Sequence, residues 1–240
     1  MHFRIIGMRG GFLKETPCSG YLITHNDESI LIDCGSGVLT RLQRFIDLNR
    51  IHHVVLSHYH YDHFSDTGVF MFSRLVNTKL GRVNVPLNIY GPESPDFEKQ
   101  VSEVEYSRFH SFNVDTVLQI GQFKISFMEN VHPVTSYSIK VECDGEILVY
   151  TSDTAYNERL FSFAMNADIL ITECSFYEDM DGKEAGHMNS KEAGILAAKT
   201  NAKKVILAHL PHFGKLEELL MSAKAQGNEN IRLAEADMLI

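Results

Sequence analysis

One short stretch, VVLSHYHYDHFSD at residues 54–66, constrains this chain more than any other. Its first three residues, Val54–Leu56, are apolar and largely β-branched, which predicts a buried strand. Four potential metal ligands follow at once: His58, His60, Asp62 and His63. A buried strand does not normally lead into so many imidazole and carboxylate groups unless something binds them. The stretch therefore predicts a metal site to which other parts of the chain add ligands.

Polar side chains of the same kinds follow other apolar segments. His132 comes after ISFMENV, Asp153 after ILVYTS and His209 after KVILA, while Glu173 follows ILIT. In layered α/β folds the ends of strands feed the loops that form binding sites, so we expect these residues to converge.

The motif and the later residues together supply five histidines and two aspartates as candidate ligands. They are His58, His60, Asp62, His63, His132, Asp153 and His209. Seven ligands are too many for one tetrahedral zinc ion. They suit two ions about 3.5–4 Å apart that share a carboxylate and a bridging water. Ligands that offer only nitrogen and oxygen favour zinc and also admit manganese or iron.

Strand and helix patterns divide the chain into two similar halves. In the first half, strands are expected at residues 2–8, 20–24, 30–33 and 52–58 and a helix at 38–48. In the second half, strands are expected at 123–129, 136–142, 147–153, 167–174 and 204–209, and helices at 157–166, 189–200 and 215–227. Two β-rich units with outer helices predict an α/β fold in which two sheets pack face to face.

Two local patterns complete this prediction. Asn189 and Glu192 are spaced as a capping box at the start of the 189–200 helix. Residues 64–115 are the least regular part, with a helix expected near 68–76 and a Pro- and Glu-rich connection at 90–100. Exposed parts of 64–106 could serve a homodimer.

Composition narrows the class of protein. The formal net charge is −9, with 31 acidic against 22 basic residues, which argues against a broad nucleic-acid surface. A local basic cluster of Arg74, Lys79 and Arg82 is conceivable, although solvated side chains are the simpler interpretation. The apolar runs are too short to cross a bilayer, and the first ten residues contain no signal-peptide core. The scattered cysteines Cys18, Cys34, Cys143 and Cys174 indicate reduced thiols in a cytoplasmic protein.

These motifs resemble the metallo-β-lactamase superfamily. The resemblance rests on HYHYDH, on LIDCGSG near the start, and on His132, Asp153 and His209 in the family's order. It implies a four-layer αββα sandwich, as a single domain over residues 1–240, with a dinuclear site at one edge. By this resemblance His58, His60 and His132 hold one metal, Asp62, His63 and His209 hold the other, and Asp153 bridges. Asp33 matches an acidic position that orients the ligands from behind, although a cap for the following helix is an equal alternative.

Two further elements resemble ribonuclease Z and its phosphodiesterase relatives. LITECSF is similar to their HEAT element, with Glu173 on its glutamate, Thr172 in place of its histidine and Ser175 in place of its threonine. AGHMNSKEAG is similar to their HST element, with His187 on its histidine. In those families this histidine and glutamate work as a pair. Asp153 stands where zinc β-lactamases carry cysteine, so antibiotic hydrolysis is not expected.

The resemblance implies a phosphodiesterase that uses a metal-bridging hydroxide, with Asp62 positioning the water and His187, oriented by Glu173, protonating the leaving oxygen. A loop histidine with no catalytic role is the plainer alternative for His187. The chain is similar to armless members of this branch, such as small phosphodiesterases of the carbon–phosphorus lyase pathway type and YhfI-type metallo-hydrolases. Only 21 positions separate His132 from Asp153, where ribonuclease Z inserts its tRNA-binding arm.

We therefore expect a small or nucleotide-like phosphodiester as substrate and no membrane partner. RNA is a possible substrate but not the favoured one. A tRNA 3′-processing endoribonuclease is the second hypothesis, and a thioesterase or lactonase is the alternative from another class. His212 is expected in a loop near the site. The remaining histidines, His2, His25, His52, His53 and His110, have no ligand context in the sequence.

Overall fold

Two β-sheets form the centre of the molecule in the computed structural model, which describes residues 1–11 and 15–240. Within these residues, the first sheet has six strands in the order β1–β6: β1 (His2–Gly7), β2 (Gly20–His25), β3 (Glu28–Ile32), β4 (His53–Val55), β5 (Leu87–Pro92) and β6 (Ser107–Phe112). The second has seven in the order β13 to β7: β13 (Ile231–Leu233), β12 (Lys204–Ala208), β11 (Ile169–Glu173), β10 (Glu146–Tyr150), β9 (Tyr137–Cys143), β8 (Phe123–Glu129) and β7 (Val117–Ile120).

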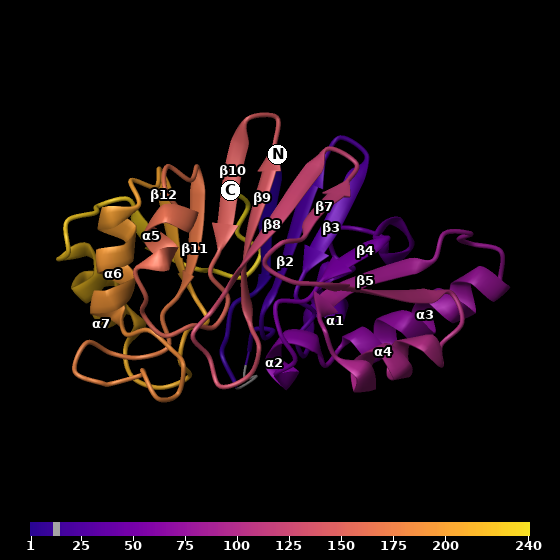
Figure 1. Ribbon diagram of the computed structural model, residues 1–240, viewed down its shortest axis with the longest axis horizontal. Coiled ribbons are helices and arrows are strands. Elements are labelled where there is room, and N and C mark those ends of the chain that lie inside the picture. Colours follow the sequence, from indigo (N-terminus) through magenta and orange to yellow (C-terminus); the bar gives the residue numbers. More distant parts are fainter. Residues whose placement is uncertain (12–14) are drawn as a thin grey trace.

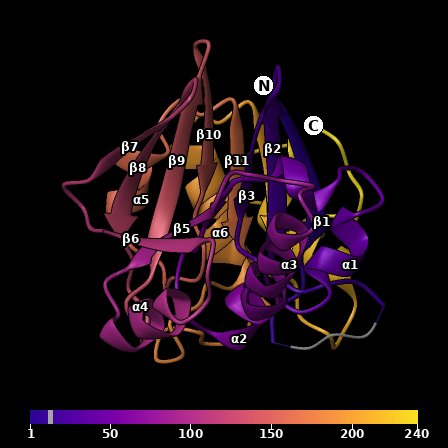
Figure 2. The same ribbon diagram turned by 90° about the vertical axis from the view of Figure 1, so that its right-hand side faces the viewer.

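Helices cover the outer face of each sheet (Figure 1). On the first sheet lie α1 (Val38–Leu42), α3 (Thr67–Lys79) and α4 (Pro95–Ser102), and on the second lie α5 (Arg159–Phe163), α6 (Ser190–Lys199) and α7 (Leu216–Lys224). Figure 2 looks onto the helices of the first sheet. The layers are therefore αββα, which confirms the expected sandwich.

Alternation along the strands explains this layering. In β4, Val54 belongs to the apolar cluster under α1, α3 and α4, while its neighbour Val55 belongs to the cluster between the two sheets. Leu31 and Ile32 of β3 alternate in the same way. Successive side chains of a strand point to opposite faces, so an apolar run such as Val54–Leu56 can be buried on both sides.

The parallel strands place their carboxyl ends at one edge of the sandwich. Strands β3 to β6 are parallel to one another, and so are β10 to β13. The short helix α2 (Tyr61–Phe64), which carries part of the ligand motif, lies at this edge, at the bottom of Figure 1. The β9–β10 hairpin turn lies at the opposite edge.

The expected helices differ in accuracy. The 189–200 prediction is confirmed, since Asn189 and Glu192 form both hydrogen bonds of a capping box at the start of α6. The 38–48 helix is shorter than predicted, because α1 ends at Leu42 and a separate 3₁₀ turn covers Leu48–Arg50. The 157–166 helix likewise shrinks to α5.

The prediction for residues 64–115 is wrong in part. The Pro- and Glu-rich connection at 90–100 contains the end of β5 and the helix α4. Ser94 caps α4 by accepting from the Phe97 N–H, and Pro95 occupies the first turn, where its missing N–H costs nothing. Proline therefore starts an element here, and β6 follows it as a sixth strand.

Arg74 corrects the idea of a basic surface cluster. Its side chain is 1% exposed and donates to the carbonyl oxygens of Ile51 at 2.5 Å and Val85 at 2.9 Å. It holds the loops around α3 together and does not face solvent. Lys79 is exposed and pairs with Glu105 at 3.1 Å. Neither interpretation of Arg74 from the sequence, as a phosphate contact or as a solvated side chain, is right.

The cysteines and the helices bear on two further expectations. All four cysteines lie within the described residues, and each is a free, buried thiol. In the same part of the chain, no helix has the length and apolar character to span a membrane.

Candidate metal centre

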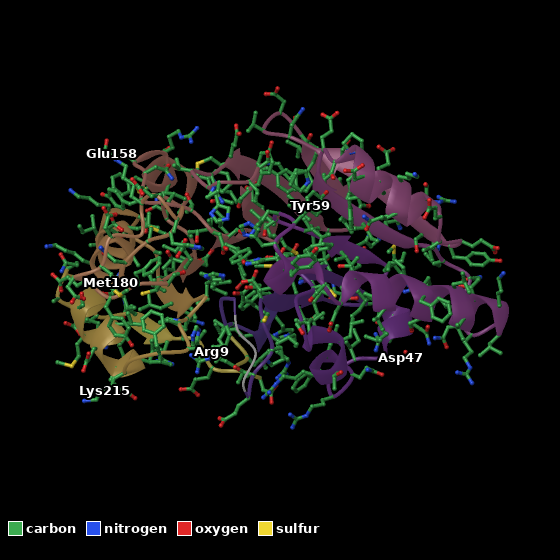
Figure 3. The ribbon with its side chains drawn as sticks, turned by 90° about the horizontal axis from the view of Figure 1, so that it is seen from below. Arg9, Asp47, Tyr59, Glu158, Met180 and Lys215 are labelled. Atoms are coloured by element: carbon green, nitrogen blue, oxygen red, sulfur yellow. The ribbon has the colours of Figure 1, made fainter. Side chains whose placement is uncertain are left out.

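Loops at the carboxyl edge bring the predicted ligands together. His58 and α2 follow β4, His132 follows β8, Asp153 follows β10 and His209 directly follows β12. The residues come from both sheets, so the site lies where the sandwich opens at this edge, which Figure 3 shows from below.

The first cluster joins three histidines and an aspartate. Ligand atoms of His58, His60, His132 and Asp153 all lie within 4.8 Å of one another. His132 Nε2 is 3.2 Å from His60 Nδ1. Two ring nitrogens facing each other at this distance point at the same space, which is the arrangement that a shared cation needs.

The second cluster contains Asp62, His63 and His209, whose ligand atoms also lie within 4.8 Å of one another. Asp62 Oδ2 is 3.1 Å from His209 Nε2. Asp153 stands between the clusters: its carboxylate oxygens are 3.3 Å from the Nε2 atoms of His63 and His209 and 3.6 Å from that of His58. A carboxylate in this position can contact two ions at once.

Buried polar atoms without partners test whether a metal fits. Among the described residues, His58 Nε2, His63 Nε2 and Asp153 Oδ1 are buried and have no hydrogen bond. Leaving such atoms unsatisfied costs roughly 1–3 kcal/mol each. All three face the space between the clusters, and all three are donors of electron pairs to metals. The residues present therefore fit divalent cations.

The opposite ring nitrogens are occupied, which leaves Nε2 free to bind a metal. His132 Nδ1 donates to the Gly186 carbonyl at 2.9 Å. His63 Nδ1 lies 2.8 Å from Asp33 Oδ2, and His58 Nδ1 lies 3.0 Å from Ser57 Oγ. Such outer partners fix the ring and place its proton away from the metal.

Asp33 lies behind the candidate ligands, and within the described residues no hydrogen bond joins its side chain to the helix that follows. It is fully buried and, besides His63, accepts from the Ser57 N–H at 2.8 Å, from the Ser57 hydroxyl at 2.9 Å and from the Tyr150 hydroxyl at 3.0 Å. The N-cap of α1 is Gly37, which has no side chain, and Asp66 accepts from the Leu39 N–H in the first turn of this helix. These contacts favour the orienting alternative from the sequence, which stays a prediction.

Backbone strain marks the same edge. Asp33, Ser152 and His209 have φ values of 54°, 52° and 51°. Residues other than glycine seldom adopt positive φ, and each instance costs on the order of 1–3 kcal/mol. These three residues follow β3, β10 and β12, so the strain turns the chain sharply where the ligands are presented.

Two glycines near the N-terminus belong to the site, and the sequence reasoning missed them. The Gly11 N–H donates to Asp62 Oδ2 at 2.7 Å. A Cβ on Gly10 would lie 2.5 Å from Cε1 of His209, so only glycine lets the chain pass this ring. The Gly–Gly pair in MRGG was the available signal. Residues 12–14, which follow these glycines, lie outside the described residues.

Glu173 and His187 form a pair beside the second cluster. Glu173 is fully buried, and its Oε1 lies 3.0 Å from His187 Nδ1 while also accepting from the Thr154 N–H at 2.9 Å. The His187 ring stacks on that of His209, with centroids 5.2 Å apart and planes 17° apart. Burial lowers the pKa of His187, but the Glu173 carboxylate outweighs it and raises the pKa to about 9. The pair can therefore hold a proton next to the clusters.

The two aspartates of the clusters stay ionised. Burial raises their pKa values, but His209 and His63 outweigh it and hold the pKa of Asp62 and that of Asp153 below the ordinary range. The carboxylates are thus available as ligands at neutral pH.

The histidines without ligand context lie elsewhere. His25 pairs with Asp144 at 2.9 Å, His53 Nδ1 lies 3.2 Å from the Tyr90 hydroxyl, and His110 Nε2 lies 3.1 Å from Asn88 Oδ1. His212 is exposed in the loop after His209, with its ring 5.5 Å from that of Phe213.

Comparison with known proteins agrees with this geometry. The model of the β-lactamase superfamily domain matches residues 28–210. The chain is 38% identical to the probable metallo-hydrolase YhfI of Bacillus subtilis over 239 residues, covering 98% of each chain. The chain belongs to the β-lactamase superfamily. Membership supports a hydrolase that binds divalent metal.

Solved structures share the fold. The crystal structure of the metallo-β-lactamase fold protein YhfI from Bacillus subtilis has a TM-score of 0.96 at 37% identity and covers all of this chain and 98% of that one. The short form of human tRNase Z has a TM-score of 0.79 at 21% identity, covering 100% and 98%. A diphosphatase of the PhnP family has a TM-score of 0.77 at 15% identity, and the match covers 100% of this chain and 96% of that one. The last two likenesses show the fold alone.

Proposed function

We propose that this superfamily member is a phosphodiesterase that acts on small or nucleotide-like phosphodiesters with two divalent metal ions. The observation that carries the proposal is the Glu173–His187 pair, which lies against the second cluster. Hydrolysis of an ester with a good leaving group needs no proton donor, whereas an alkoxide leaving a phosphodiester does. A buried carboxylate that keeps an imidazole protonated supports the second kind of reaction.

Each residue has a role that follows from its place. Bound divalent cations would lower the pKa of coordinated water and neutralise phosphoryl oxygens. Asp62, fixed by the Gly11 N–H, orients the attacking water and accepts its proton. His187 donates its proton to the leaving oxygen, and Glu173 stabilises the imidazolium and holds the ring. The seven ligands keep the roles given above, with zinc proposed and manganese or iron as substitutes.

Metal content tests the dinuclear part of the proposal. Protein purified without chelator should approach two metal ions per chain by elemental analysis. Asp153→Ala should remove both, because its carboxylate lies 3.3–3.6 Å from histidines of both clusters. A chain that stays at one ion under metal excess and is fully active would overturn the dinuclear proposal.

A tRNA 3′-processing activity has less support. His132 and Asp153 are 21 positions apart, and the segment between them holds a plain hairpin of β9 and β10, with a turn at Asp144 and Gly145. Binding a folded RNA takes several phosphate contacts from basic side chains. The chain has a net charge of −9 and Arg74 is buried, so the protein surface offers few basic side chains for such contacts.

A partner chain could add basic side chains for RNA binding. We propose a homodimer that forms through α3. Val69, Phe72 and Val76 of this helix and its C-cap residue Leu80 are exposed and recur every three or four residues. This spacing places them on one face. Analytical ultracentrifugation of the wild type and Phe72→Ser tests it: a dimer that the substitution leaves unchanged would place any interface elsewhere.

The deciding experiment varies the leaving group. His187→Ala should barely slow hydrolysis of bis(p-nitrophenyl) phosphate, and should slow an alkyl or ribose diester about 10²–10⁴-fold, the range for general acid catalysis. Equal losses on both would assign His187 to the metals or to substrate binding.

Substrate class is tested by kcat/KM on 2′,3′-cyclic nucleotides and on a 3′-extended tRNA precursor, at near-physiological salt with Zn²⁺ and Mn²⁺ separately. Site-specific trailer removal would establish the tRNA activity. Rapid thioester or lactone hydrolysis with no diester turnover would instead make the protein an acyl hydrolase.

A further inference from the structure

Ser175 connects the metal centre to the Glu173–His187 pair. It lies two residues beyond β11, and its Oγ is 2.7 Å from Glu173 Oε2 and 2.8 Å from His209 Nδ1. A third separation, 3.4 Å to His187 Nδ1, is longer and secondary. The hydroxyl therefore stands between a buried carboxylate and the outer nitrogen of a candidate metal ligand.

Counting protons decides the direction of these bonds. A serine hydroxyl has one proton to donate and two lone pairs that accept. Ionised Glu173 can only accept, so Ser175 donates its proton to Oε2. His209 Nδ1 must then donate to Ser175, which places the ring proton on Nδ1 and leaves Nε2 with its lone pair. That is the tautomer that binds a metal through Nε2.

The same arrangement occurs in the other half of the molecule. Ser57 donates to Asp33 at 2.9 Å and lies 3.0 Å from His58 Nδ1, so the same count places the His58 proton on Nδ1. His58 Nε2 is one of the buried atoms that the described residues leave without a partner. The repetition of carboxylate, serine and histidine, with the inner nitrogen open, supports a role in metal binding.

We propose that Ser175 is a positioning residue that fixes the metal-binding tautomer of His209 through Glu173. Packing already fixes the ring itself, because Gly10 lies against it and His187 stacks on it. The hydroxyl therefore sets where the proton resides. Without it, a proton on Nε2 facing Asp62 Oδ2, 3.1 Å away, competes with the metal.

The test compares substitutions that differ only in the hydroxyl. Ser175→Ala and Ser175→Val should each lower the affinity for one of the two metal ions by about 10–100-fold, the range for loss of an outer partner. Ser175→Thr should restore it. Affinities come from competition with a chromophoric chelator, with Zn²⁺ as the probe. Threonine and valine have nearly the same shape, so this pair separates the hydrogen bond from packing.

Nitrogen NMR of the His209 ring in the metal-free protein, at a pH where the ring carries a single proton, gives a second readout, which a merely structural role would not move. The wild type and Ser175→Thr should show the proton on Nδ1, and Ser175→Val a shift toward Nε2. Ser222→Ala is the control, because its hydroxyl donates to Glu178 on the surface. Zinc affinity within about threefold of wild type in the Val variant, with the tautomer unchanged, would overturn the proposal.

Neither readout depends on phosphodiester turnover, so the inference about His209 stands or falls apart from the proposed function. One kinetic consequence does rest on that function. If Ser175 also steadies Glu173, then Ser175→Val should slow alkyl diesters more than nitrophenyl diesters even at saturating metal.

Discussion

Two buried carboxylates organise the two sides of the centre, and they differ in what they serve. Asp33 contacts His63 directly and His58 through Ser57. Glu173 contacts His187 directly and His209 through Ser175. We call these sets the Asp33 network and the Glu173 network. Both histidines of the Asp33 network are candidate ligands, whereas the Glu173 network divides between a candidate ligand and the proposed proton donor.

Surroundings explain the division. Asp33 lies between the sheets, where Tyr150 from the second sheet donates to it and both of its histidines are fully buried. His187 in the Glu173 network is partly exposed in a loop at the edge of the site. A substrate can therefore reach a histidine of the second network but neither histidine of the first. Under the proposed function, the enclosed network would serve metal binding and the open one proton transfer.

The largest expected effect comes from neutralising the Asp33 network. Asp33→Asn should weaken the binding of both metal ions, because His58 belongs to one cluster and His63 to the other. Loss of one outer partner costs about 10–100-fold in affinity, so the two effects together approach about 10²–10⁴-fold. Asparagine tolerates the positive φ of 54° at this position, which limits damage to the fold.

Chelator competition measures this effect, with Asp66→Asn as the control. The Asp66 side chain accepts from the Leu39 N–H of α1 at 3.0 Å, and within the described residues it has no hydrogen bond to a candidate ligand. If Asp33→Asn weakens the binding of only one ion, then the hydrogen bonds from Asp33 through Ser57 to His58 contribute nothing to metal affinity. The two networks would then differ in function although their geometry is similar.

A smaller effect, confined to one cluster, is expected from Gly10→Ala. The added Cβ would lie 2.5 Å from Cε1 of His209, so the ring or the chain must move. Only the ion of the second cluster should weaken, and about 10-fold or more is expected, as for loss of an orienting contact. Gly68→Ala is the matched control, since a Cβ there meets no atom within 4 Å in α3. Equal metal loss in both clusters would show that Gly10 supports the edge as a whole.

The sequence predicted the sandwich because its strands are apolar on both faces and its helices carry clear apolar stripes. It failed at residues 64–115, where Pro95 looked like a break and is instead the first residue of α4. Burial of Arg74 could not be foreseen either, since the carbonyls it binds come from loops that meet only in three dimensions.

For the site, side-chain type and position after strands were enough to single out the candidate ligands that the structure brings together. Their outer partners were not visible in the same way. Asp33 was found by resemblance, but Ser57 and Tyr150 are ordinary residues whose role depends on the sandwich bringing them to Asp33. Backbone contributions are the hardest case: the Gly11 N–H and the Gly186 carbonyl act without a distinctive side chain.

The smallest and most local effect concerns protonation of His187 in the metal-free protein. Its pKa is raised to about 9 because Glu173 outweighs the effect of burial, so the imidazolium should persist at neutral pH. Glu173→Gln removes the charge and keeps the shape, and the pKa should then fall below about 6.5, the ordinary value, because burial remains. NMR titration of the ring measures both values.

The raised pKa of His187 also determines how the stability of the metal-free protein changes with pH. A folded-state pKa above the unfolded value adds stability that is fully present below about pH 6.5 and is lost as pH rises through about 9. Chemical denaturation of the metal-free protein should show this loss in the wild type, and a reduced loss in Glu173→Gln. His63, whose pKa is also raised, is unaffected by that substitution because Asp153 and Asp33 hold its proton. If His187 titrates near 6.5 in both proteins, then Glu173 does not keep a proton on His187 for a substrate. The Glu173 network would then only support a candidate metal ligand, as the Asp33 network does.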